Sequence, residues 1–76
     1  MTITEQIEVS AGAIRSRARA LGLALLDRDT AYRLWDEQHR AQPGTVAGLF
    51  YLAATDRQMI RVVNRAVDGY HRSNGR

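Results

Sequence analysis

The sequence predicts an all-α protein, a small bundle of about four helices joined by short turns. Three observations predict this class. Two long segments carry apolar residues at alternating spacings of three and four, which is the repeat of one helix face. Residues typical of helix caps and helix breaks separate the periodic segments. No second segment patterned as a strand is present, so a sheet would have no partner strands.

The longest apolar repeat lies between residues 7 and 25 and predicts the first helix. Its members share one helix face: Ile7, Ala11, Ile14, Ala18, Leu21 and Leu25. Thr2 and Glu5 have the spacing of a capping box, so we expect the helix to begin near Thr2 or Thr4. The small alanines let another helix approach closely, and the leucines fill a wider gap at the far end. This helix is expected to be the scaffold on which the others pack.

The second helix is expected to begin after a cap at Asp27 or Asp29 and to run to about Gln42, before Pro43-Gly44. Its predicted apolar face consists of Ala31, Leu34, Trp35 and Gln38. The uncharged segment 45–54 that follows predicts a short helix buried on nearly all sides.

The last helix is expected to begin after Thr55, which has capping-box spacing to Gln58. Its predicted apolar stripe contains Met59, Val63, Ala66 and Tyr70, with Ile60 and Val67 beside them. Gly69 is expected to end the helix in the left-handed conformation. The whole chain, 1–76, is then a single helical domain in which 72–76 form a flexible polar tail.

The length of the chain indicates a need for a partner. A domain of 76 residues buries only about 60% of the surface that its unfolded chain exposes, so its stability is marginal. The sequence contains no cysteine, which excludes disulfides and thiolate metal sites, and its two histidines are far apart. We therefore expect no metal and no cofactor. Homo-oligomerisation, or docking on a larger protein, is the remaining route to stability.

Several function classes are not expected. A glycine-rich phosphate loop and a lysine to serve one are both absent, and no serine lies beside a base pattern, so no catalytic residue and no small-molecule substrate are predicted. No apolar run is long enough to span a membrane, and the N-terminus does not have the pattern of a signal peptide, which favours the cytoplasm. Arg15, Arg17 and Arg19 are interpreted as charges flanking a packing helix, because Glu5 and Glu8 on the same helix oppose a membrane surface.

One candidate surface combines aromatic and apolar residues of the types that anchor protein interfaces. The expected protein-interface residues are Tyr32, Trp35, Val46, Leu49, Phe50 and Tyr51. For Trp35 the alternative is a core position with Tyr32 at its edge, which is favoured in so small a domain. For segment 45–54, burial inside one chain and burial in a dimer both remain open. His39 is expected to be a surface residue.

A second candidate surface is the arginine face of the last helix. The residues that could contact nucleic acid are Arg57, Arg61, Asn64, Arg65 and Arg72. The alternative, which is favoured, is a solvated face with Arg65–Asp68 and Asp68–Arg72 pairs. The net charge of +3 permits nucleic-acid contact without requiring it. The pattern resembles a helix-turn-helix only in outline, since the turn lacks glycine.

These observations favour a non-catalytic protein–protein interaction module that self-associates, as a homodimer or a related oligomer. All eleven basic residues are arginine, which is typical of GC-rich genomes and suggests a small bacterial or phage regulatory protein. The alternative function is a small DNA-binding, helix-turn-helix-like transcriptional regulator that uses the arginine face.

Overall fold

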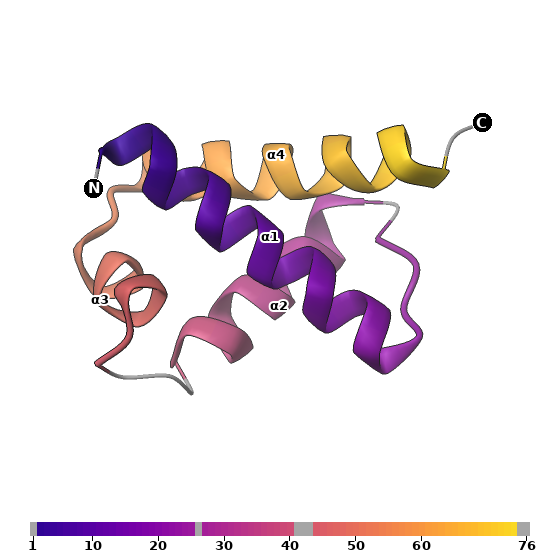
Figure 1. The fold of residues 1–76 in the computed structure, drawn as a ribbon, viewed down its shortest axis with the longest axis horizontal. Helices are drawn as coiled ribbons and strands as arrows, with labels where there is room; N and C mark the ends of the chain where they lie inside the picture. The colour runs from indigo at the N-terminus through magenta and orange to yellow at the C-terminus, as the bar shows by residue number, and fades with distance from the viewer. Residues whose placement is uncertain (1, 26, 41–43, 75–76) are drawn as a thin grey trace.

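The computed structural model describes residues 2–25, 27–40 and 44–74, and these form four helices with no strand among them. The helices are α1 (Ile3–Leu21), α2 (Arg28–Arg40), α3 (Val46–Ala53) and α4 (Asp56–Asn74). Helix α1 packs most extensively on α4, α2 packs against both, and the short α3 lies near the N-terminal end of α1 (Figure 1). The predicted all-α bundle is confirmed.

Side-chain caps fix where the helices begin. Both predicted capping boxes are present: the Glu5 amide donates to the Thr2 hydroxyl at 3.1 Å, and the Gln58 amide donates to the Thr55 hydroxyl at 3.2 Å. Of the two candidate caps for α2, Asp27 is the one used, because its carboxylate accepts a hydrogen bond from the Thr30 amide at 3.0 Å. Each cap satisfies an amide that has no partner within its own helix.

Helix α1 ends earlier than its apolar repeat suggests. Gly22 adopts a left-handed conformation (φ 68°), and the amides of Gly22 and Leu23 donate to the carbonyls of Arg19 and Ala18 at 3.1 and 2.9 Å. This pattern is a Schellman motif. The chain therefore leaves the helix before Leu25, which is fully buried from the following loop, whereas Leu21 is 44% exposed. The prediction that Leu21 and Leu25 continue the helical stripe was wrong.

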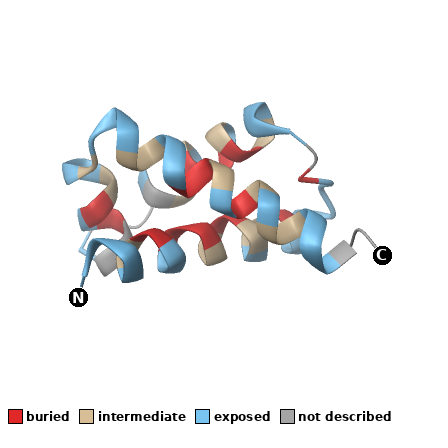
Figure 2. Cartoon of the chain, turned by 90° about the horizontal axis from the view of Figure 1, so that it is seen from above, coloured by how far each residue is buried: buried red, intermediate tan, exposed pale blue. Residues whose placement is uncertain are grey.

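The core lies where α1, α2 and α4 meet, and Figure 2 shows the buried residues on the helix faces turned toward one another. Buried hydrophobic residues are Ile7, Ala11, Ile14, Ala18, Leu25, Ala31, Leu34, Trp35, Phe50, Val62, Val63 and Ala66. Trp35 is only 3% exposed, so its side chain belongs to the core. The predicted face of α2 is confirmed for Ala31, Leu34 and Trp35, whereas Gln38 is only half-buried.

Helix α4 differs from expectation in two ways. Val62 is fully buried and Ile60 is 42% exposed, so the buried stripe lies slightly to one side of the predicted one. Gly69 does not end the helix, which continues to Asn74. Residues 72–74 are thus helical and residues 75–76 lie outside the described part of the chain, so the flexibility expected for 72–76 stays a prediction. Within the described ranges, no helix is both long and apolar enough to cross a membrane.

Candidate functional site

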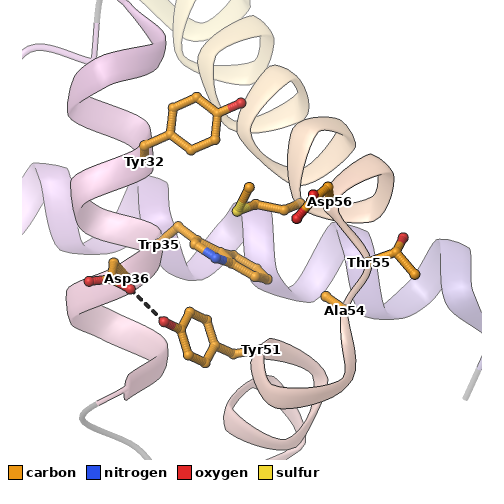
Figure 3. A pocket seen from close by; sticks show the side chains of 8 residues that line it. Tyr32, Trp35, Asp36, Tyr51, Ala54, Thr55 and Asp56 are labelled. Atoms are coloured by element: carbon orange, nitrogen blue, oxygen red, sulfur yellow. Dashed lines mark hydrogen bonds between the residues drawn. The ribbon is translucent and has the colours of Figure 1, made fainter.

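An open pocket lies where α2 faces the end of α3 and the first turn of α4. Its volume is about 350 Å³. Its lining residues are Tyr32, Trp35, Asp36, Tyr51, Ala54, Thr55, Asp56 and Met59. Figure 3 shows Tyr32, Trp35 and Asp36 projecting from α2 toward Tyr51 and Asp56 on the other wall. Three of the predicted interface residues (Tyr32, Trp35 and Tyr51) are therefore brought together here.

Aromatic packing forms the inner wall of this pocket. The ring centroids of Trp35 and Tyr51 are 5.3 Å apart with the planes tilted by 49°, and Trp35 meets Phe50 edge-on, with centroids 6.1 Å apart. Such arrangements are the favoured geometries of aromatic pairs. Phe50 is 5% exposed and belongs to the core, whereas Tyr32 and Tyr51 are half-buried and reach the surface. The inner wall of the pocket is thus aromatic and continuous with the core.

A polar cluster closes one edge of the pocket. The Tyr51 hydroxyl donates to the Asp36 carboxylate at 2.5 Å, and the Arg40 guanidinium forms an ion pair with the same oxygen at 2.8 Å. The Tyr51 hydroxyl also accepts from Arg40 at 3.4 Å. The Tyr51 hydroxyl and then the Asp36 carboxylate raise the pKa of Arg40 above its ordinary value. This cluster ties the second half of α2 to α3 and orients the Tyr51 ring.

One side of α3 faces solvent, contrary to the prediction that segment 45–54 is buried on nearly all sides. Leu49 is 57% exposed and Leu52 is 75% exposed. The physical reason is geometric: α3 has only eight residues, and it packs on α1 and α2 through the side that carries Phe50. The side chain of Val46, another predicted interface residue, lies outside the described residues, as does that of His39.

The predicted arginine face is divided by the structure. Arg57, Arg61 and Arg72 are exposed on α4 and form no ion pair with a described carboxylate. Arg65 instead turns toward α1, where its Nε atom donates to the Glu8 carboxylate at 2.6 Å. The expected pairs with Asp68 are not among the ion pairs of the described residues. Asn64 is half-buried on the same helix.

The pocket contains two carboxylates in different surroundings. Its two carboxylates differ: Asp36 is held by Tyr51 and Arg40, and Asp56 is exposed in the first turn of α4. No group of three or more His, Cys, Asp or Glu side chains able to hold a metal occurs among residues 2–25, 27–40 and 44–74. A concave aromatic surface with a few fixed polar groups can receive an apolar or aromatic side chain of a partner.

Sequence reasoning did not find the pocket as a unit. It placed Tyr32, Trp35 and Tyr51 on an interface but did not assign Asp36 or Met59 to that interface. The i,i+4 spacing of Tyr32 and Asp36 could have indicated that both lie on one side of α2 beside Trp35. The contact between Asp36 and Tyr51 joins two helices across the segment 41–45, and no local pattern reports such a contact.

Comparison of the chain with protein-family models, with curated proteins and with solved structures finds no match. Fold and site together define a small helical domain that carries an aromatic pocket, an exposed apolar helix side and an arginine face.

Proposed function

We propose that the protein is a non-catalytic interaction module that self-associates through the exposed side of α3. The observation that carries this proposal is the exposure of Leu49 (57%) and Leu52 (75%), three residues apart on a helix without a charged residue. Single exposed leucines are common on soluble proteins. Two neighbouring leucines on an uncharged helix favour contact with another apolar surface.

Charge favours a second copy of the same chain as the occupant. The chain has a net charge of +3, so most pairs of identical surfaces would repel each other. The Val46–Ala53 helix is uncharged, so two copies of it can approach about a twofold axis without placing like charges opposite one another. A twofold interface uses the same patch on both subunits, which suits a self-complementary apolar helix.

The aromatic pocket supplies the rest of the proposed contact. A standard interface buries roughly 800 Å² on each partner, which is about a sixth of the 4945 Å² accessible surface of the chain. The exposed side of one eight-residue helix is too small for this, so the interface extends onto neighbouring surface. The pocket beside Tyr51 is the concave part of that surface and would receive an anchoring side chain from the second copy.

Light scattering across a range of micromolar concentrations tests this proposal. We expect a dimer mass for the unmodified chain and a monomer mass for Leu52→Glu, with helicity by circular dichroism unchanged because Leu52 is exposed. Leu21→Glu is the matched control, since Leu21 is also an exposed leucine but lies at the far end of α1 from α3 (Figure 1). A folded monomer at every concentration, or a Leu52→Glu dimer as stable as the original, would contradict self-association through α3.

The second candidate function is DNA binding by a small regulator, and one observation favours it. Arg57 and Arg61 are exposed one turn apart on α4 and are not neutralised by a described carboxylate. Contacts from such side chains to phosphates predict duplex binding that weakens steeply with salt. The double variant Arg57→Glu with Arg61→Glu should abolish this binding, and Arg33→Glu on α2 should not. A gel shift on random duplex at low and high salt decides between these outcomes.

A further inference from the structure

A second hollow lies away from α3, between the C-terminal halves of α1 and α4. Its volume is about 290 Å³. Its lining residues are Arg15, Arg19, Gly22, Leu23, Tyr70 and Ser73. Among the residues that the structure describes, no carboxylate lines this hollow, whereas two guanidinium groups one helical turn apart do. Cationic side chains gathered around a concavity are the arrangement that binds an anion.

Arg15 is held in place by a backbone carbonyl of α4. Its side chain is half-buried, and its Nη1 atom donates to the backbone carbonyl of Arg65 at 3.2 Å. It forms no ion pair with any described carboxylate. The neighbouring acid on α1, Glu8, is paired with Arg65 instead. One guanidinium edge is therefore fixed to α4, and no carboxylate in the described part of the chain neutralises the group beside the hollow.

The backbone of α4 makes room for this guanidinium at Gly69. A Cβ atom at position 69 would lie 2.6 Å from Nη1 and 2.9 Å from Cζ of Arg15. Both distances are shorter than non-bonded atoms allow, so a Cβ at this position would require the end of the Arg15 side chain to move. A glycine inside a helix is unfavourable, and here its effect is to seat a cation at the edge of a hollow.

The second arginine is not engaged by the end of its own helix. Arg19 is exposed and forms no ion pair with a described carboxylate. The carbonyls of Ala18 and Arg19, which could otherwise attract it, already accept from Leu23 and Gly22. The C-terminus of a helix carries a partial negative charge of about half a unit. Two guanidinium charges exceed that value, so the hollow remains attractive to an anion.

We infer that this hollow binds the phosphate group of a small phosphorylated molecule. Arg15 and Arg19 can each direct N–H groups at the oxygens of one phosphate, as a guanidinium does in paired hydrogen bonds. Leu23, which is 44% exposed, and the Tyr70 ring form an apolar wall for the organic part of the ligand. The volume of about 290 Å³ lies just below the range for drug-sized ligands, which suits a small phosphate ester.

The shape of the site favours a small molecule over a nucleic acid. A duplex presents a convex row of phosphates, and the exposed arginines near the start of α4 match such a row better than a recessed hollow does. The hollow receives a single phosphate group with its attached carbon skeleton. A free phosphate ester and a lipid headgroup share this chemistry, and the experiment separates the two sources.

Nuclear magnetic resonance of the isotope-labelled chain tests the inference, with inorganic phosphate and glycerol 3-phosphate as probes at constant ionic strength. We expect saturable shifts of the amides of Gly22, Leu23 and Ser73 with both probes. Arg19→Gln should weaken binding at least tenfold. The matched control is Arg57→Gln, which removes an exposed arginine about 24 Å along α4 from Ser73 and should leave binding unchanged.

A second variant shows whether a loss of binding comes from the site rather than from misfolding. Gly69→Ala places a Cβ atom where the Arg15 guanidinium lies and should also reduce phosphate affinity at least tenfold, while α4 stays helical. Shifts that rise linearly without saturation, or that persist in Arg19→Gln, would overturn the inference. So would binding confined to vesicles of phosphatidylcholine with phosphatidic acid, or to duplex DNA. Leu52→Glu, which tests self-association, should bind phosphate normally, so the two proposals fail separately.

Discussion

The Arg15 side chain of α1 occupies the space that a side chain at Gly69 of α4 would take: a Cβ at Gly69 would lie 2.6 Å from the Arg15 Nη1 atom. The same guanidinium donates to the Arg65 carbonyl, one turn before Gly69. The α1–α4 contact is therefore not only apolar. A charged side chain from α1 lies against the α4 backbone at Gly69, where no Cβ occupies the space.

The first prediction concerns the coupling between these two residues. Alanine is favoured over glycine in a helix interior by about 1 kcal/mol. In the unmodified chain, Gly69→Ala should show little of this gain, because the new Cβ displaces Arg15 and breaks its hydrogen bond to Arg65. In an Arg15→Ala background the same change should stabilise the fold by roughly 0.5–1 kcal/mol. Urea unfolding of the four proteins measures this coupling.

Additive effects in this cycle would contradict the proposed steric relationship. Contacting residues are expected to show non-additive changes in the free energy of unfolding. Gly12 supplies the control position, because it is a glycine inside α1 as Gly69 is inside α4. A Cβ at Gly12 would lie 3.9 Å from Arg15 Nη2, which is an ordinary contact. Gly12→Ala should therefore show the same effect in both backgrounds.

The second prediction concerns a buried hydroxyl. Ser10 is fully buried on α1, and its Oγ atom has no hydrogen-bond partner among the described residues. A buried polar group without a partner costs about 1–3 kcal/mol. Ser10→Ala should thus raise the free energy of unfolding by about 1 kcal/mol. Thermal unfolding measures this change. The control is Ser16→Ala, which alters an exposed serine and should change the free energy of unfolding little. If Ser10→Ala is destabilised instead, the hydroxyl has a hydrogen-bond partner in solution.

The helices could be predicted from sequence because their signals are local. The Thr2–Glu5 and Thr55–Gln58 spacings each place two side chains within reach of two backbone amides, and both capping boxes are present. Gly69 shows where local reasoning fails. Glycine near a helix end is typical of a C-cap, but here it lies inside α4 against Arg15, 54 positions earlier in the sequence. Only the tertiary fold reveals that partner.

The candidate site was predictable in its residue types but not in its geometry. Tyr32, Trp35 and Tyr51 belong to types common at interfaces, and the structure gathers them at one pocket. The exposure of Leu52 could not be predicted, because it depends on which side of an all-apolar helix finds a neighbour. A helix without polar residues has no amphipathic pattern from which its orientation can be read.

The third prediction uses the only tryptophan. Trp35 is 3% exposed and packs against Phe50 and Tyr51. Trp35→Ala should lower the free energy of unfolding by about 3–5 kcal/mol, which is a large part of the total stability of a domain this size. Trp35→Phe should be much milder because it keeps an aromatic ring. Circular dichroism with urea measures both variants, and a loss below about 1 kcal/mol for Trp35→Ala would contradict its core position.

The last prediction concerns acid and the start of α2. The Thr30 amide, as the main cause, lowers the pKa of Asp27 below its ordinary value of 3.8. Because the folded-state pKa is the lower one, the cap stabilises the fold above the unfolded-state value and is lost as the pH falls through the folded-state value. Helicity should therefore decline in acid. Asp27→Asn should weaken that dependence while keeping stability near neutral pH, since asparagine caps about as well as aspartate. Circular dichroism against pH measures this dependence. The control is Asp29→Asn, which removes a carboxylate two residues later that does not cap the helix. An equal change in both variants would contradict the assignment of the cap to Asp27.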